Sequence, residues 1–393
     1  MSIVIPSPDR PSSDDSCPGA VRLHAADDGY VARVRIPGGR VSPAQLVALA
    51  DLAESAGDGH LYLTSRGNVQ LRGLGSGCGQ DVADALYAAG LLPSVSHDRV
   101  RNVVASPLSG VVGPDIESLL SELDAALLED EALVALSGRF LFGIDNGTGD
   151  VLALKPDVAV IVEAGDTVRL AIAGQPTAVA APTDLAVDLL IGAAHRFLAL
   201  RAEHGPTAWR VSDLPDAALV ELAPGRPGPT LGAPDLTSGH TNLDLSAGEA
   251  AGLGNHGSTV VAGVLLGSAP AEAWRAIAAL VPADAAGAIR LTPWRSVVLI
   301  GPTPDAIDVL ASHGFLLDDA DPLAPVTACI GRPGCGKALA DVRTDALTLA
   351  TDPTLATPGA RLHVSGCDRR CGHPTGPHLS AVATGDGYQI QEL

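Results

Sequence analysis

Alternating apolar and polar residues predict the same order of elements twice along the chain. Residues 30–36, YVARVRI, alternate as a strand does, and a Gly-Gly turn follows them. Ser42 and Gln45 form the capping-box pattern that opens a helix, and a strand-like stretch, LYLTSRGNVQLRG, comes next. From Gly257 the order recurs as STVVAGVLL, a turn, a helix through Trp274 and the stretch IRLTPWRSVVLIG. We therefore predict a duplicated chain of the α+β class.

The duplication divides the chain into five parts. A length of 393 residues exceeds what one hydrophobic core usually supports, which agrees with several domains. The stretch 224–253, rich in Gly, Pro, Thr and Ser, is predicted to link the two copies. The expected parts are a flexible N-terminus at 1–28, a first half-domain at 29–102, a longer domain without cysteines at 103–235, a second half-domain with its linker at 236–310, and a cysteine-bearing domain at 311–393.

Charge and composition narrow the possible partners. The chain has 45 acidic and 25 basic side chains, a net charge of −20, and only 3% aromatic residues. A nucleic-acid backbone would be repelled, and few rings are present to stack on bases. No apolar run reaches the ~18 residues of a membrane-spanning helix, and Met1–Asp28 lacks an apolar signal core. We expect a cytoplasmic protein that binds neither nucleic acid nor membrane.

Four of the six cysteines form two pairs near the end of the chain. Cys329 and Cys335 are spaced C-x5-C, and Cys367 and Cys371 are spaced C-x3-C. Thiolates are soft ligands, and four of them complete one iron–sulfur cubane. A four-thiolate zinc site and four reduced, buried thiols are the alternatives, but zinc ribbons favour C-x2-C to C-x4-C in both pairs, and C-x5-C is wide for that geometry. We predict a [4Fe–4S] cluster on these four cysteines.

Basic side chains at strand spacing predict an anion-binding surface. Arg33 and Arg35 share one face of their predicted strand, and Arg99 and Arg101 repeat that spacing. In SRGNVQLRG the residues of equal parity are Arg66, Asn68, Gln70 and Arg72. Arginine binds carboxylates through two parallel N–H bonds, so in an acidic chain this set favours a polyanionic ligand. For any single arginine, a solvated position beside an aspartate is an equally good interpretation.

The segments LTSRGNVQLRG and VRNVVASPLSG, with both cysteine pairs, resemble the sirohaem-dependent nitrite and sulfite reductase superfamily. This resemblance covers the chain from about residue 28 and implies two ferredoxin-like half-domains and two cluster-type α/β domains. Within the superfamily, RLTPWRSVVL, GCGKALADVRTDA and LHVSGCDRRCGHP are most similar to the precorrin-3B synthase family. The likeness thus implies that a tetrapyrrole is the substrate rather than the cofactor.

That family is understood to hydroxylate precorrin-3A at a meso carbon with dioxygen and to close a γ-lactone, giving precorrin-3B in aerobic cobalamin biosynthesis. The resemblance implies a [4Fe–4S] cluster, a mononuclear non-haem iron and a separate NADH-dependent electron donor. The side chains that it implies for binding the carboxylate-rich substrate are Arg35, Arg66, Asn68, Gln70, Arg72, Arg101, Asn102 and Arg139. No acid or base residue is evident. His363, His373 and His378 surround the second cysteine pair, where a histidine is more often a hydrogen-bond donor than a ligand.

Two other functions are compatible with the motifs. One is a sirohaem-dependent nitrite or sulfite reductase. In sulfite reductases the stretch aligned with SGRFLFGID carries two lysines, whereas here Arg139 and Leu141 stand in those places. The loss of one cation weakens a pocket built for a small dianion. The other alternative, a non-catalytic iron–sulfur electron-transfer protein, would need no anion-binding face.

Overall fold

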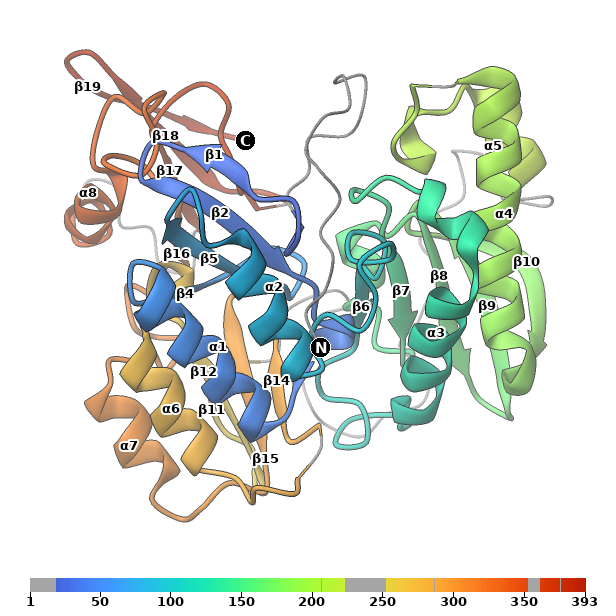
Figure 1. The fold of residues 1–393 in the computed structure, drawn as a ribbon, viewed down its shortest axis with the longest axis horizontal. Helices are drawn as coiled ribbons and strands as arrows, with labels where there is room; N and C mark the ends of the chain where they lie inside the picture. The colour runs from blue at the N-terminus through green and yellow to red at the C-terminus, as the bar shows by residue number, and fades with distance from the viewer. Residues whose placement is uncertain (1–18, 206, 223–251, 286, 353–360, 375) are drawn as a thin grey trace.

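The computed structural model describes residues 19–205, 207–222, 252–285, 287–352, 361–374 and 376–393. Within these ranges the chain forms four β-sheets with helices packed against them, as Figure 1 shows. The α+β class and the duplication are confirmed. Most of the predicted linker at 224–253 and of the predicted flexible N-terminus lies outside the described residues. In the described part, no helix is long and apolar enough to cross a membrane.

The two half-domains interlock by exchanging a strand. The first sheet consists, in spatial order, of β1 (His24–Ala26), β2 (Gly29–Val34), β5 (Val69–Leu74), β4 (His60–Leu63) and β13 (Ser268–Pro270). The second consists of β11 (Gly254–Asn255), β12 (Thr259–Gly263), β15 (Ser296–Ile300), β14 (Ile289–Leu291) and β3 (Arg40–Val41). Strand β13 belongs to the second copy by sequence and β3 to the first. Each copy therefore completes the sheet of the other.

The helices of both half-domains form one layer over these sheets (Figure 1). They are α1 (Pro43–Ala56), α2 (Gly79–Ala88), α6 (Ala271–Ala279) and α7 (Ala306–Ser312). The predicted capping box is present, because Ser42 Oγ accepts a hydrogen bond from the Gln45 amide at 3.1 Å and Gln45 Oε1 accepts one from the Ser42 amide at 3.0 Å. Pro270 occupies the equivalent position before α6 and gives no side-chain cap. One hydrophobic core, which includes Trp274, serves both half-domains.

The two remaining sheets repeat one another. The first has the spatial order β10 (Gln175–Pro182), β9 (Thr167–Ile172), β8 (Val158–Glu163), β7 (Phe142–Asp145) and β6 (Val103–Ala105). The second has the order β16 (Val326–Ala328), β17 (Leu362–Ser365), β18 (Leu379–Thr384) and β19 (Gly387–Glu392). In each, three consecutive parallel strands are followed by an antiparallel one. We call the second sheet the cysteine-bearing sheet, because the four clustered cysteines follow its strands.

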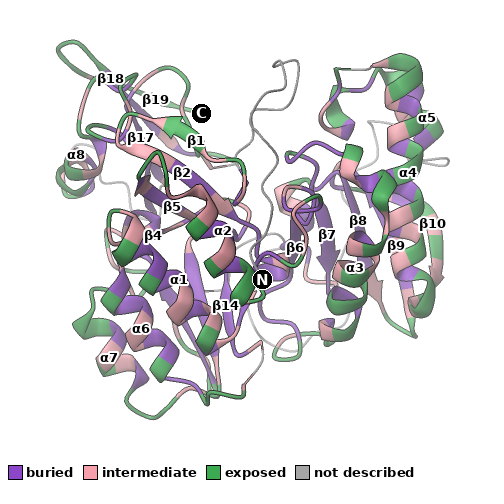
Figure 2. Ribbon diagram, in the orientation of Figure 1, coloured by how far each residue is buried: buried purple, intermediate pink, exposed green. Residues whose placement is uncertain are grey.

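Helices pack against these sheets, and Figure 2 shows β7 and β8 as buried strands. The helices are α3 (Glu117–Glu129), α4 (Ala186–His204), α5 (Asp216–Leu222) and α8 (Val342–Leu349). The short 3-10 helices are η1 (Pro37–Gly39), η2 (Glu131–Ala135), η3 (Leu152–Leu154), η4 (Thr183–Leu185), η5 (Val211–Asp213) and η6 (Leu265–Gly267).

The prediction that LYLTSRGNVQLRG forms one strand-like stretch is wrong. The segment is a hairpin, in which β4 and β5 pair antiparallel around a turn centred on Gly67. Gly67 has a φ of +67°, a conformation that glycine adopts without strain. Arg66 and Asn68 therefore lie in the turn, and only Gln70 and Arg72 continue along the strand. Likewise Arg99 and Arg101 precede β6: Arg99 lies in a turn and Arg101 directly follows it, so neither is on a strand.

Candidate functional site

The four clustered cysteines lie at one edge of the cysteine-bearing sheet. Cys329 follows β16 directly and Cys367 comes shortly after β17, and these strands pair in parallel. The carboxyl ends of parallel neighbours meet at one edge of a sheet, so the two cysteine loops emerge together. Cys371 is exposed, and its pKa is raised by partial burial and by the nearby thiols of Cys329, Cys367 and Cys335. The other three sulfurs are thus within electrostatic range of Cys371.

Backbone hydrogen bonds fix the cysteine loops. The Gly366 amide donates to Cys329 Sγ over 3.2 Å, and the Cys329 amide donates to the Val364 carbonyl over 3.0 Å. Hydrogen bonds to cysteine sulfur are among the features that set the potential of iron–sulfur clusters. Four cysteine thiolates, one of which accepts a backbone N–H hydrogen bond, are a suitable set of ligands for a [4Fe–4S] cluster. In the described ranges, no three His, Cys, Asp or Glu side chains are arranged to hold a single metal ion. We therefore assign no residues to a mononuclear iron.

The loop around Cys335 is held by the first half-domain. Arg72 forms a bidentate ion pair with Asp28, with both N–O distances at 2.9 Å, and its Nη2 also donates to the Gly334 carbonyl at 3.0 Å. On the other side of Cys335, the Gly336 amide donates to Asp27 Oδ2 at 2.5 Å. The turn between β1 and β2 therefore contacts the loop on both sides of this cysteine. Neither aspartate was singled out in the sequence.

A polar face of the first sheet lies beside the cysteine-bearing sheet (Figure 1). The strand register places Arg33, Gln70, Tyr62 and Ser268 in one row across β2, β5, β4 and β13. Arg343 of α8 donates to Ser268 Oγ at 2.6 Å and lies 5.8 Å from the centre of the Tyr62 ring. These side chains thus form one row across the first sheet, and the cysteine-bearing domain borders this row through Arg343.

Five of the eight predicted substrate-binding residues are buried and bonded within the protein. Arg35 Nη2 donates to the Gly138 carbonyl at 3.0 Å. Arg101 forms a bidentate pair with Asp124, at 2.7 Å for both contacts. Asn68 and Asn102 are joined by a hydrogen bond. Arg72 is bonded to Asp28 and to the Gly334 carbonyl. These side chains support the surface from within.

The other three predicted residues reach the outside of the protein. Arg66 and Gln70 are partly exposed on the first half-domain, beside the buried set. Arg139 is exposed, and its guanidinium lies 4.2 Å from the centre of the Trp209 ring, so a cation–π contact orients it. Leu141, two residues further on, is buried and places no polar group at the surface.

The rings of the three histidines near the second cysteine pair lie close together. The ring centres of His373 and His378 are 5.8 Å apart, and those of His363 and His378 are 6.5 Å apart. His363 Nδ1 contacts Thr327 Oγ1 at 2.8 Å. Burial and the charge of Arg295 lower the pKa of His363 to about 3, so this imidazole is neutral at pH 7.

The duplication shows which residue of the first α/β domain corresponds to Cys329. The Ser106 amide donates to the Ile144 carbonyl at 3.1 Å, and the Asn146 amide donates to Ser106 Oγ at 3.1 Å. These are the bonds that Cys329 makes with Val364 and Gly366. A serine hydroxyl thus stands at the position of the Cys329 thiol, and Asp150 accepts a 2.6 Å hydrogen bond from it. Only the second copy carries the cysteine quartet.

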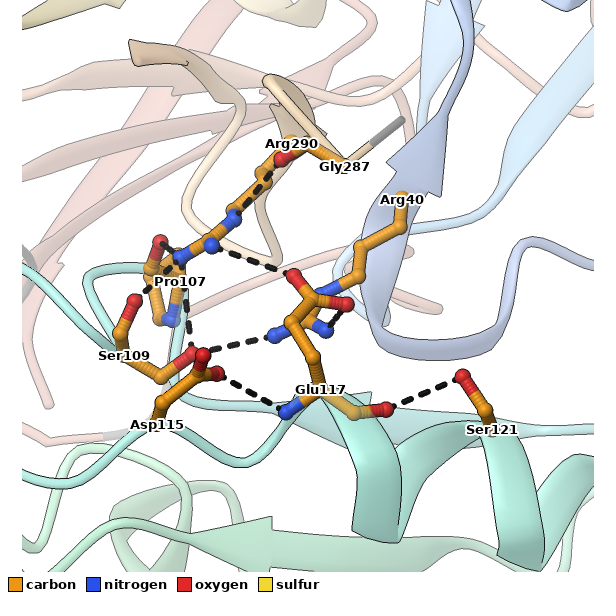
Figure 3. Close-up of polar contacts among 8 residues, drawn as sticks. All are labelled: Arg40, Pro107, Ser109, Asp115, Glu117, Ser121, Gly287 and Arg290. Atoms are coloured by element: carbon orange, nitrogen blue, oxygen red, sulfur yellow. Dashed lines mark hydrogen bonds and ion pairs between the residues drawn. The ribbon is translucent and has the colours of Figure 1, made fainter. Parts of the chain in front are cut away.

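An ion-pair junction joins both half-domains to the first α/β domain. Arg40 of β3 and Arg290 of β14 are paired neighbours in the second sheet. Glu117, in the first turn of α3, forms ion pairs with both guanidinium groups (Figure 3). Arg290 Nη1 also donates to the carbonyls of Pro107 and Ser109, at 2.6 and 2.9 Å. The junction fixes the loop after β6 against the exchanged strand β3.

Comparison with known proteins agrees with this architecture. Residues 24–89 match the nitrite/sulfite reductase ferredoxin-like half domain. A precorrin-3B synthase from a Sinorhizobium species is 27% identical over 387 residues, which cover 95% of this chain and 82% of the relative. A ferredoxin–nitrite reductase from Synechococcus elongatus is 25% identical over 386 residues, covering 88% of this chain and 74% of that protein.

A solved structure, that of the NirA protein of Mycobacterium tuberculosis, has a similar fold. The TM-score is 0.65 at 18% sequence identity, and the match covers 92% of this chain and 73% of that one. The chain therefore resembles nitrite and sulfite reductases in its fold, and its sequence resembles that of a precorrin-3B synthase over almost its whole length.

Proposed function

We propose that the protein is a precorrin-3B synthase, which hydroxylates precorrin-3A with dioxygen and closes a γ-lactone in aerobic cobalamin biosynthesis. The observation that carries the proposal is the position of the four-cysteine edge beside a polar, arginine-containing face, in a chain that resembles such a synthase over 95% of its length. Precorrin-3A carries several carboxylates, which arginine side chains bind well.

The cluster would be held by Cys329, Cys335, Cys367 and Cys371. When bound, a [4Fe–4S] cluster supplies electrons one at a time. Hydroxylation inserts one oxygen atom of dioxygen into the substrate, and two electrons with two protons convert the other atom to water. A separate NADH-dependent reductase is the proposed source of those electrons. The exposure of Cys371 gives such a donor access to this edge.

We assign direct contacts with substrate carboxylates to the accessible residues Arg66, Gln70 and Arg139. The buried residues Arg35, Asn68, Arg72, Arg101 and Asn102 are proposed to hold that surface in shape, because each already forms a side-chain hydrogen bond within the protein. Such support contributes by keeping the reacting carbon in a fixed position during the reaction.

The test begins with anaerobic purification of the full chain. Iron and acid-labile sulfide are counted, the optical spectrum is recorded, and the protein is incubated with precorrin-3A, a reductant and air. We expect about four iron and four sulfide per chain, no sirohaem bands, and conversion of precorrin-3A to a product that contains one added oxygen. The matched control is the same incubation without dioxygen, which should yield no product.

A sirohaem-dependent reductase is the second candidate, because the nitrite reductase relative matches 88% of the chain. It predicts tightly bound sirohaem and reduction of nitrite or sulfite by the purified protein. Leu141 is buried where sulfite reductases carry a lysine, which is unfavourable for a small-anion pocket. Sirohaem bands together with no turnover of precorrin-3A would replace the synthase proposal with this one.

A further inference from the structure

The turn between β14 and β15 has the same geometry as the turn between β4 and β5. In the first half-domain the Gly67 amide donates to the Thr64 carbonyl over 3.1 Å. In the second, the Arg295 amide donates to the Thr292 carbonyl over 3.1 Å. Gly67 and Arg295 are thus equivalent positions of the duplicated hairpin.

Both positions have a left-handed backbone. Gly67 has a φ of +67° and Arg295 a φ of +60°. Glycine adopts this conformation freely, whereas a residue with a Cβ atom is strained in it. Strain of this kind persists where the surrounding structure enforces it, and it occurs often at functional sites. The second copy therefore has an arginine at a position where the backbone favours glycine.

The side chain of Arg295 reaches the second cysteine loop. Its Nη2 donates to the Gly372 carbonyl at 3.2 Å, and Gly372 directly follows Cys371. Two glycines leave space for it: a Cβ atom on Gly267 would lie 2.5 Å from Arg295 Cδ, and one on Gly372 would lie 2.9 Å from Arg295 Nη2. The strained backbone and both glycines thus serve the placement of one guanidinium group.

Arg295 also acts on the cysteines through its charge. Burial and the neighbouring Arg343 lower the pKa of Arg295 to about 10, while the Cys329 sulfur acts in the opposite direction. The guanidinium therefore remains positive at pH 7 and is within electrostatic range of Cys329. Arg343 is itself held by hydrogen bonds to the Leu266 carbonyl and to Ser268.

We propose that Arg295 is a positioning residue for the cluster: it fixes the loop from Cys367 to Cys371 and stabilises the reduced cluster by its partly buried positive charge. Reduction adds one negative charge to a cluster, and a cation in a poorly screened setting favours the more negative state. This inference rests on the cluster of the proposed function but not on its tetrapyrrole substrate.

Three substitutions separate the effect of the Arg295 charge from the effect of its contact with the cysteine loop. Arg295→Gly gives the second hairpin the residue that the first one has, which removes the strain together with the charge and the contact with Gly372. Arg295→Met removes the charge but keeps an aliphatic chain. Arg295→Lys keeps the charge and loses the planar donor group. The control is Arg196→Met, which removes one positive charge from α4, where Arg196 pairs with Glu221.

The readouts are the reduction potential of the cluster, the rate of iron loss to a chelator and the unfolding temperature of the holoprotein. For Arg295→Gly and Arg295→Met we expect a reduction equilibrium constant about tenfold lower, which is about 59 mV more negative for one electron. Both should also lose iron faster, although Arg295→Gly unfolds at no lower temperature than the wild type. Arg295→Lys should keep a potential near that of the wild type but lose iron faster.

Three outcomes would overturn the inference, and they are distinguishable. If the wild type binds a cluster and Arg295→Gly and Arg295→Met match it in potential and in iron loss, Arg295 has no role toward the cluster. If the wild type binds no iron or sulfide, the cluster of the proposed function fails and this inference fails with it. A potential lowered equally by Arg196→Met would also contradict the inference, because net charge alone would then explain the shift.

Discussion

Asn68 donates a hydrogen bond through Nδ2 to Oδ1 of Asn102 over 2.9 Å, inside the protein. Asn68 Oδ1 in turn accepts from the Ile36 amide, and Asn102 Nδ2 donates to the Phe140 carbonyl, each at 2.9 Å. Both asparagines are fully buried. The chain of bonds joins the hairpin turn of the first half-domain to the first α/β domain. It fixes the orientation of the turn that carries Arg66.

Replacement of Asn102 by alanine should destabilise the fold. The change removes the partner of the Asn68 side-chain NH2 group and that of the Phe140 carbonyl. Each unsatisfied buried group costs ~1–3 kcal/mol. We expect a loss of roughly 2–4 kcal/mol in the free energy of unfolding, measured by urea denaturation. Gln70→Ala, a partly exposed neighbour, is the control and should change stability little. A loss in Asn102→Ala no greater than that of the control would show that the network does not contribute to stability.

Asp28→Asn should loosen the loop of Cys335. The substitution leaves the buried Arg72 guanidinium without its carboxylate, although Asp28 is itself about one-fifth exposed. Broken buried pairs cost several kcal/mol, and this exposure reduces the expected loss to about 2 kcal/mol. We also expect faster alkylation of Cys335 in the apoprotein, followed by mass spectrometry. Asp51→Asn, at an exposed ion pair with Arg275, is the control. Unchanged alkylation of Cys335 would contradict a role of Arg72 in holding this loop.

Single Cys→Ala substitutions test the quartet. Replacement of Cys329, Cys335, Cys367 or Cys371 should abolish or sharply reduce bound iron and sulfide, because each thiolate is expected to hold one iron. Cys78→Ala is the matched control, since Cys78 lies before α2 in the first half-domain, and it should keep about four iron per chain. Full iron and sulfide content in any of the four variants would remove that cysteine from the ligand set.

The sequence predicted the features that depend on local pattern. The cysteine spacing, the capping box at Ser42 and the order of elements in each copy are all visible in short stretches of residues. The parity of β2 and β5 also places Arg33 and Gln70 in one row, because side chains alternate along any strand. The left-handed turn at Gly67 was missed, although a glycine between two polar residues is a recognisable turn signal.

Features that depend on pairing across the chain could not be predicted in this way. The exchange of β3 and β13 joins residues more than 200 positions apart, and nothing in either segment specifies its partner. The partners of Arg72 and Arg101 are aspartates on other elements, so an arginine in an internal ion pair looks the same in sequence as one in a binding site. Arg295 could have been found by aligning the sequences of the two hairpins, since it occupies the position equivalent to Gly67.

The junction in Figure 3 should depend on the carboxylate of Glu117. Without it, the guanidinium groups of Arg40 and Arg290 would be neighbours on paired strands with no ion-pair partner between them. We expect Glu117→Gln to lower the free energy of unfolding by about 2 kcal/mol, because Glu117 is partly exposed and the pairs are partly screened. Added salt should reduce the difference by screening the repulsion between the arginines. Glu122→Gln, on the same helix, is the control, and equal losses in both variants would show that the junction adds nothing.

Asp150 should make the stability of the first α/β domain depend on pH. Burial, and then the charge of Asp145, raise the pKa of Asp150 to about 6 from its ordinary value of 3.8. The folded state therefore holds a proton that the unfolded state has already released, so stability decreases as pH rises from about 4 to about 6. A shift of this size corresponds to about 3 kcal/mol.

Asp150→Asn removes that ionisation and keeps an oxygen to accept the hydrogen bond from Ser106. We expect the variant to be more stable than the wild type at pH 8 and to show a weaker loss of stability between pH 4 and 6. Urea denaturation at a series of pH values gives both quantities, and Asp184→Asn at an exposed position is the control. Parallel pH profiles for Asp150→Asn and the wild type would show that Asp150 ionises equally easily in the folded and unfolded chains.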